Sequence, residues 1–222
     1  MSCVLVFRRC GLPESSLTSS PPPSLPFALP TTERHLMLHG VDISAHQSSY
    51  EAAGLDFVFI KATEGRSYAS PHRAEQAAKA RKAGCVVGFY HFLWPGNIAA
   101  QAEYFVEKCG AKEGDVLAAD WETTSSGTHA SGAQKDQFLR EVKKLAPSHR
   151  VLLYTNVSFW KGHDTSSYAA DGLWIADYVS PGKPRIKGKW LFHQHTDRPL
   201  DKNVAQFENR DALKKWAAAG KE

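Results

Sequence analysis

The sequence has 222 residues, a length that suits one domain with an appended segment. Hydrophobic residues make up 42% of the chain, which is enough for a buried core and too much for a wholly disordered protein. The net charge of +4 is small and the basic residues are scattered, so no nucleic-acid partner is expected. No apolar stretch approaches the roughly 20 residues of a membrane-spanning helix, so no membrane span is expected.

The first 37 residues differ in composition from the rest of the chain. The stretch GLPESSLTSSPPPSLPFALPTTER is rich in Ser and Pro and has no sustained periodicity, which predicts a disordered leader over 1–37. Met37 directly precedes LHGVDIS, so a mis-assigned upstream start is an equally good explanation. The apolar part of MSCVLVFRRCG is too short for a secretory signal. We therefore expect one globular domain over 38–222.

Short apolar runs alternate with helical stretches from residue 38 onward. The predicted strands cover 39–44, 56–62, 85–92, 115–122, 150–156, 172–178, 189–195 and 201–207. The predicted helices cover 71–84, 97–110, 131–147 and 211–219. No helix is predicted between about residue 150 and residue 211. Strand–helix alternation produces right-handed βαβ units, and eight strands in a domain of this size predict a small α/β barrel with a parallel sheet.

The four cysteines do not form a CxxC pair, which argues against a zinc or redox motif. Cys85 lies in the apolar segment GCVVGFYHF and is expected to be a buried small hydrophobic residue. A disulfide between Cys85 and Cys109 stays open, because sequence alone does not decide it.

Polar and aromatic side chains recur where the predicted strands end, which is where parallel α/β barrels carry their working residues. These are Asp42, Lys61, Glu64, Tyr90, His91, Asp120, Glu122, Tyr154, Asn156, Asp177, Tyr178, His193, Gln194 and His195, followed by Asp201 and Asn203. Carboxylates with aromatic neighbours are typical of glycoside cleavage, because one acid protonates the leaving oxygen while another stabilises or attacks the cationic transition state. Like charges held close raise one pKa, which supplies the acid.

The stretch DVLAADWETTSSG, residues 115–127, carries the most informative of these acids. Asp120 and Glu122 end an apolar strand, and side chains two apart on a strand share a face. Crowding two carboxylates costs electrostatic free energy unless the protein uses the arrangement, but an isolated D-x-E is more typical of a strand-end turn with two solvated acids. Trp121 points the other way on an extended strand, so we expect it to pack against a helix.

Seven segments, taken in order, resemble the glycoside hydrolase family 25 lysozymes (Chalaropsis-type N-acetylmuramidases). They are HGVDISAHQ, DFVFIKATEG, GFYHF, AADWE, LLYTN, LWIADY and DKNVAQF. The resemblance runs from about residue 39 to residue 207. It implies a TIM-like (β/α)5(β)3 barrel, which agrees with the loss of helices in the second half.

The resemblance also implies an activity and a partner. The reaction is hydrolysis of the β-1,4 bond between N-acetylmuramic acid and N-acetylglucosamine, and the partner is bacterial cell-wall peptidoglycan. We expect a monomer that needs no cofactor and no metal and acts at the extracellular cell wall. Because no clear signal peptide is present, release of the phage endolysin type is one route.

The resemblance assigns Glu122 as the general acid and Asp120 as the second carboxylate, which stabilises the oxocarbenium ion or orients the N-acetyl group. Asp42 and Asp201 complete the acidic cluster. The expected substrate-binding residues are Glu64, Tyr90, Tyr154, Asn156, Asp177 and Gln194. The covalent retaining, substrate-assisted and inverting routes all stay open.

Other interpretations of single residues remain. Glu64 could simply pair with Lys61, and Asp42 could cap a turn. Tyr90 and Tyr154 could be packing residues of the barrel wall.

A metal site and two other functions are weighed against the hydrolysis of peptidoglycan. His91, His193 and His195 with Asp42 could hold zinc, but their spacing fits no common ligand motif, so no metal is expected. The two other functions are hydrolysis of another N-acetylated glycan, such as chitin, and non-catalytic binding of wall glycan in the same groove.

Overall fold

The structure is a computed structural model that describes residues 37–47 and 49–220. Its strands are β1 (Leu38–Ile43), β2 (Phe57–Glu64), β3 (Tyr68–Ala69), β4 (Val86–Phe92), β5 (Val116–Asp120), β6 (Arg150–Asn156), β7 (Gly172–Ala176), β8 (Phe192–Thr196) and β9 (Lys202–Ala205). Its helices are α1 (Arg73–Lys82), α2 (Ile98–Cys109), α3 (Gly132–Leu145), α4 (Val157–His163) and α5 (Arg210–Ala218). Apart from Met37, the predicted leader lies outside the described residues.

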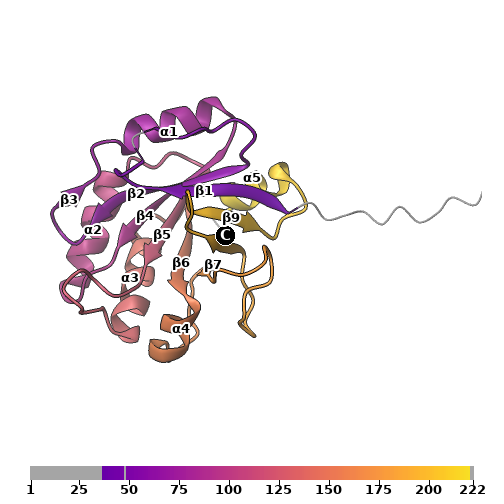
Figure 1. Cartoon of the computed structure of the whole chain (residues 1–222). Helices are drawn as coiled ribbons and strands as arrows, with labels where there is room; N and C mark the ends of the chain where they lie inside the picture. The colour runs from indigo at the N-terminus through magenta and orange to yellow at the C-terminus, as the bar shows by residue number, and fades with distance from the viewer. Residues whose placement is uncertain (1–36, 48, 221–222) are drawn as a thin grey trace, which may run out of the picture. The chain divides into compact units, whose positions relative to one another are not determined.

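Eight of these strands form a closed barrel (Figure 1). The order around it is β1-β9-β8-β7-β6-β5-β4-β2, and β2 pairs again with β1. The pairings from β1 through β2 and β4 to β8 are parallel, whereas β9 runs antiparallel to both β8 and β1. The short β3 folds back on β2 as a hairpin. The expected α/β barrel is therefore confirmed, and β9 is the one antiparallel strand among the eight that close it.

Helices α1 to α4 pack on the outside of the barrel, and α5 covers the end at which the strands begin. The guanidinium Nε of Arg150, the first residue of β6, donates to the carbonyl of Trp216 in α5 at 3.1 Å. Nε of Arg210 donates to Asp56, just before β2, at 2.9 Å. The connecting loops form the opposite end of the barrel, where the parallel strands finish.

Alternation along the strands divides the core into two layers. In β2, Phe57 and Phe59 belong to the cluster inside the barrel, while Val58 and Ile60 belong to the cluster between barrel and helices. Two glycines make room for the inner rings. A Cβ on Gly40 would lie 2.5 Å from the Phe57 ring, and a Cβ on Gly88 would lie 2.4 Å from the Phe59 ring. These glycines let large aromatic residues fill a narrow barrel.

All eight predicted strands and all four predicted helices overlap observed elements, but the expectation of no helix between residues 150 and 211 was wrong. Helix α4 begins directly after β6. The extended Asn156 caps it, and its Oδ1 accepts a hydrogen bond from the backbone N–H of Phe159 at 2.9 Å. Strand β5 also ends at Asp120, so Glu122 lies two residues beyond the strand instead of within it.

Cys85 and Cys109 are buried free thiols, so the disulfide that the sequence left open is not formed. The Sγ atom of Cys85 lies 3.3 Å from the carbonyl of Leu55, and that of Cys109 lies 3.5 Å from the carbonyl of Val106. Within residues 37–47 and 49–220, no helix has the length and apolar character needed to cross a bilayer.

Candidate active site

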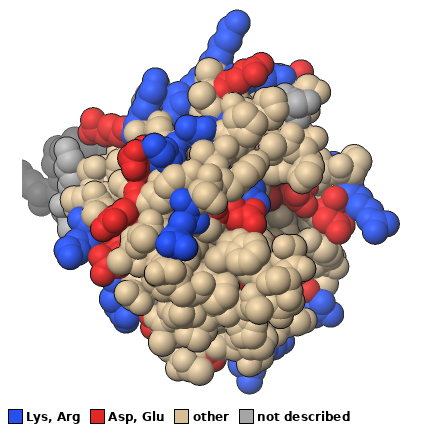
Figure 2. All heavy atoms as spheres, turned by 90° about the vertical axis from the view of Figure 1, so that its left-hand side faces the viewer, with Lys and Arg blue, Asp and Glu red and all other residues tan. Residues whose placement is uncertain are grey.

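A pocket of about 250 Å³ opens where the parallel strands finish. It is lined by Asp42, Tyr90, Asp120, Glu122, Tyr154, Trp174, Tyr178, Gln194 and Asp201. Figure 2 faces the side toward which β1 and β2 run, and it shows acidic side chains gathered at a hollow in this surface. All four predicted acids lie in this one pocket, which we call the acid pocket. They come from β1, from the end of β5 and from the residue before β9.

Asp42 is held in place by two amides at the bottom of the acid pocket. Its Oδ2 accepts hydrogen bonds from Nε2 of Gln194 at 2.9 Å and from Nδ2 of Asn203 at 2.7 Å. Burial, reinforced by the charge of Asp201, raises the pKa of Asp42 from 3.8 to about 8, although the two amides oppose this rise. Asp42 is therefore protonated at neutral pH.

The raised pKa of Asp42 predicts an unusual dependence of stability on pH. The unfolded chain loses this proton near pH 4, whereas the folded chain keeps it up to about pH 8. The folded state binds more protons between these values, so the free energy of unfolding falls as pH rises through this window. We expect Asp42→Asn to remove at least about 1 kcal/mol of this fall, or roughly 2–4 °C in the melting temperature. Thermal melts of both proteins from pH 4.5 to pH 9 test this, and parallel curves would contradict it.

Asp120 and Glu122 form the second part of the cluster. Asp120 is only 5% exposed, and within the described residues its Oδ1 has no hydrogen-bond partner. Burial raises the pKa of Asp120 well above its usual value, and both the charge of Glu122 and a hydrogen bond to that carboxylate raise it further. Burial also raises the pKa of Glu122, although Asp120 and Lys61 oppose this rise. The two carboxyl groups are thus set to hold a proton between them at a pH where ordinary acids are ionised.

Trp121, between these acids, points away from the pocket as expected. Its indole Nε1 donates to the carbonyl of Ala130 at 2.6 Å, and its ring meets Phe159 of α4 edge-on at 4.9 Å between centroids. Its backbone N–H donates to the carbonyl of Tyr154 at 2.9 Å. Trp121 therefore anchors the chain between the two acids, and its predicted packing against a helix is confirmed.

Asp201 lies at the rim of the acid pocket. Burial raises its pKa to about 6, with further contributions from the charges of Asp197 and Glu122. Its carbonyl accepts a hydrogen bond from the backbone N–H of Asp42 at 3.2 Å, which ties the segment before β9 to β1. This backbone hydrogen bond holds Asp201 at the pocket.

Tyrosines link the walls of the acid pocket. The hydroxyl of Tyr154 donates to Oε1 of Gln194 at 3.0 Å, and the hydroxyl of Tyr178 lies 3.3 Å from the same atom. Tyr90 and Tyr154 both pack against the ring of Trp174, at 6.1 and 4.4 Å between centroids. The two tyrosines therefore serve both as barrel packing and as pocket lining.

The other three predicted substrate-binding residues are occupied with partners of their own. Glu64 pairs with Lys61 at 2.6 Å and accepts from the indole of Trp94 at 2.9 Å, outside the acid pocket. Asn156 caps α4. Asp177 accepts from the backbone N–H of Arg185 at 2.7 Å and forms an ion pair with its guanidinium at 2.6 Å. Asn156 and Asp177 do line a neighbouring hollow of about 300 Å³, which also includes Glu122, Tyr154 and Tyr178.

The arrangement of histidines argues against the zinc site that we considered. His91 lies on the outer face of β4, where it stacks on Phe138 at 4.8 Å and contacts Oγ1 of Thr63 at 2.8 Å. Burial lowers the pKa of His91 to about 4, so it is neutral. His193 faces away from the pocket as well and contacts the carbonyl of Asp177 at 2.7 Å. No group of three or more metal-ligating side chains occurs in the described part of the chain.

Trp174, Tyr178 and Asn203 were assigned no catalytic or substrate-binding role from the sequence, although Tyr178 and Asn203 were noted where the predicted strands end. Trp174 and Tyr178 line the pocket, and Asn203 holds Asp42 while its Oδ1 accepts from the indole of Trp174 at 2.7 Å. The alternation of side chains along the strands could have predicted that Trp174 faces the pocket. Trp174 pairs in register with Tyr154 in the parallel sheet, so the two side chains share a face.

Comparison with known proteins points to one family. The family model of glycosyl hydrolases family 25 matches residues 41–204. The N,O-diacetylmuramidase of Chalaropsis sp is 31% identical over 208 residues, covering 81% of this chain and 99% of the relative. The autolytic lysozyme of Clostridium acetobutylicum is 30% identical over 72% of this chain, which spans about half, 51%, of that relative's length. The structure of a muramidase from Acremonium alcalophilum superposes with a TM-score of 0.72 at 29% identity, covering 82% of this chain and 99% of that one.

Proposed function

The chain belongs to glycosyl hydrolase family 25 and is therefore a glycoside hydrolase, and from this premise we propose that it is a muramidase acting on bacterial peptidoglycan. The bond that it cleaves is the β-1,4 linkage between N-acetylmuramic acid and N-acetylglucosamine. The observation that carries the proposal is the gathering of Asp42, Asp120, Glu122 and Asp201 in one pocket at the mouth of the barrel. We place this catalytic barrel over 38–222, acting as a monomer at the cell wall outside the cell.

Glu122 is the general acid in this proposal. It lies beyond the end of β5 and lines both the acid pocket and the neighbouring hollow, so a sugar ring on either side of it would place the linking oxygen near its carboxyl group. Its raised pKa keeps it protonated at a pH where an ordinary glutamate is ionised. Glu122 then gives its proton to the leaving oxygen.

Asp120 is the assisting carboxylate. It lies deeper than Glu122, at the last position of a buried strand, and its Oδ1 is free of hydrogen bonds to other described residues. When Glu122 holds the shared proton, Asp120 is ionised and faces the positive charge that develops on the sugar. The same oxygen is also free to orient an N-acetyl group. Tyr90 and Tyr154 provide apolar surface for the ring, and Asp42 contributes a neutral carboxyl group.

The proposal is tested with purified bacterial sacculi and with chitin oligomers. We expect the full chain to release reducing ends from sacculi, and mass spectrometry to find N-acetylmuramic acid at the new reducing ends. Cleavage of chitin alone would assign a different N-acetylated glycan. Binding to sacculi without any release of reducing ends would show a binding module and contradict the enzymatic proposal.

A further inference from the structure

The acid pocket is the first of three neighbouring hollows around the barrel. The hollow of about 300 Å³ shares Glu122, Tyr154 and Tyr178 with the acid pocket. It shares Arg185 with a third hollow of about 690 Å³, which lies beside α4 and β7. The third hollow therefore adjoins the second at Arg185.

The third hollow combines apolar walls with a basic rim, and we call it the basic pocket. Its walls include Trp160, Tyr168, Leu173 and Ile186, and its rim carries Lys161, Lys187 and Lys189. The rim belongs largely to the segment KPRIKGK, residues 183–189, which contains four basic residues and no acid. In the part of the chain that the structure describes, neither Lys187 nor Lys189 forms an ion pair. Their charges are free for a ligand.

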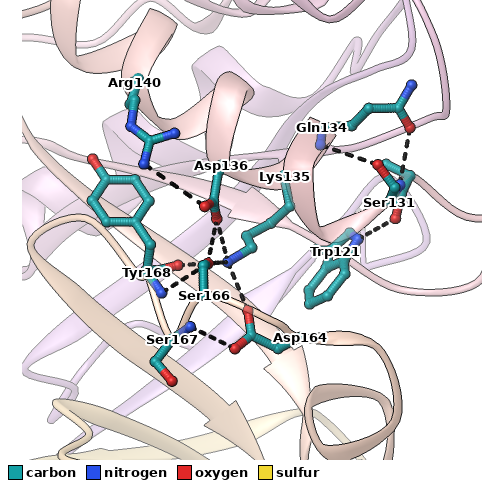
Figure 3. A network of polar contacts seen from close by, with 11 residues as sticks. Trp121, Ser131, Gln134, Lys135, Asp136, Arg140, Asp164, Ser166, Ser167 and Tyr168 are labelled. Carbon is teal, nitrogen blue, oxygen red and sulfur yellow. Dashed lines mark hydrogen bonds and ion pairs between the residues drawn. The ribbon is translucent and has the colours of Figure 1, made fainter.

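One wall of the basic pocket is held in a fixed shape. Ser167 and Ala170 adopt left-handed backbone angles with φ of 56° and 52°, which cost free energy in residues other than glycine. Beneath them, the fully buried Lys135 donates to Asp164 at 2.8 Å and to the carbonyl of Tyr168 at 2.7 Å (Figure 3). The backbone N–H of Ser167 donates to Asp164 at 2.7 Å. This network holds the strained loop, so the pocket is formed before any ligand arrives.

We propose that the basic pocket binds the acidic stem peptide carried by the glycan strand under cleavage. The inference rests on the proposed function, because the hollow beside Glu122 adjoins the basic pocket at Arg185, which favours a substituent of the substrate as the occupant. A stem peptide offers carboxylates to Lys187 and Lys189, and alanine methyl groups to the apolar wall. A phosphodiester polymer of the bacterial cell wall would match the positive charge of the lysines but would leave the apolar side chains of the pocket without a partner.

The test compares two soluble substrates that differ only in the peptide. One is a peptidoglycan oligomer with stem peptides, and the other is the same oligomer after an amidase has removed them. We expect Lys187→Glu with Lys189→Glu to raise KM about tenfold for the first substrate, because attraction becomes repulsion at an exposed rim. Neither kcat nor the KM for the peptide-free oligomer should change. Because both side chains are exposed, the double variant should fold normally.

A matched control reverses two other exposed lysines. Lys214→Glu with Lys215→Glu makes the same change in net charge on α5, at the far end of the barrel. If this control raises KM equally, only net charge matters and the proposal is overturned. An equal rise for both oligomers, or competition by poly(glycerol phosphate) with no preference for the peptide-bearing oligomer, would also overturn it.

Calorimetric binding of the same two oligomers separates this inference from the proposed function. A wild-type protein that cleaves neither oligomer but binds the peptide-bearing one more tightly, through Lys187 and Lys189, would contradict only the muramidase proposal. Cleavage of both oligomers with no effect of the double variant would contradict only the stem-peptide site.

Discussion

Replacing Glu122 with Gln should lower kcat on peptidoglycan by about 10²- to 10⁴-fold, the usual contribution of a positioned general acid. The substitution keeps the shape of the side chain but removes the proton that reaches the leaving oxygen. KM should change little, because glutamine still lines the same two hollows. Steady-state rates of reducing-end release, measured for both proteins from pH 4 to pH 9, give the comparison.

The fold should survive this substitution. Burial makes an ionised Glu122 costly, so a neutral amide should leave the melting temperature unchanged or raise it. Glu103→Gln is the matched control, because it makes the same chemical change at an exposed position on α2. It should retain full activity. A Glu122→Gln protein that folds and keeps more than half of the wild-type kcat would rule out Glu122 as the general acid.

The sequence located the acids of the site because barrel geometry is regular. Apolar runs predict strands, parallel strands end on one face, and charged residues at those ends must therefore meet. Asp42, Asp120 and Glu122 follow this rule and share the acid pocket. Alternation within each strand contains further information. Since Tyr90 faces the pocket, its neighbour His91 must face the helices, which is a second reason, besides the ligand spacing, to expect no zinc site with His91.

Other features depend on contacts that no local pattern encodes. Helix α4 is short, and its cap, Asn156, is also the last residue of β6, so strand and helix signals overlap. The direction of β9 is set by the turn before it and not by composition. The sequence placed Asp177 among the expected substrate-binding residues, but the structure pairs it with Arg185, which comes from a loop with no regular pattern. Asn156 and Asp177 therefore lie near the site, but their side chains stabilise the fold.

Replacing Lys135 with Met should have the largest effect on stability. Lys135 is fully buried in α3, and its ammonium group contacts Asp136 at 2.6 Å and Asp164 at 2.8 Å. It also lies 5.4 Å from the centre of the Trp121 ring (Figure 3). Methionine fills a similar volume but leaves the buried Asp164 without its cation, and leaves Asp136 with only the exposed Arg140 at 3.7 Å. Loss of one partner from a buried ionic group costs about 3–5 kcal/mol, so the melting temperature should fall by roughly 10 °C.

Two controls distinguish the buried charge from a general loss of lysine. Lys143 pairs with Asp171 at 2.7 Å but is 37% exposed, so Lys143→Met should cost less than about 1 kcal/mol. Adding Asp136→Asn and Asp164→Asn to Lys135→Met removes the two buried carboxylate charges and should recover part of the stability. Equal melting temperatures for the two single lysine variants would contradict the argument. Since Lys135 contacts Trp121, and Trp121 anchors the chain between Asp120 and Glu122, kcat should also fall at temperatures where the Lys135→Met protein is still folded.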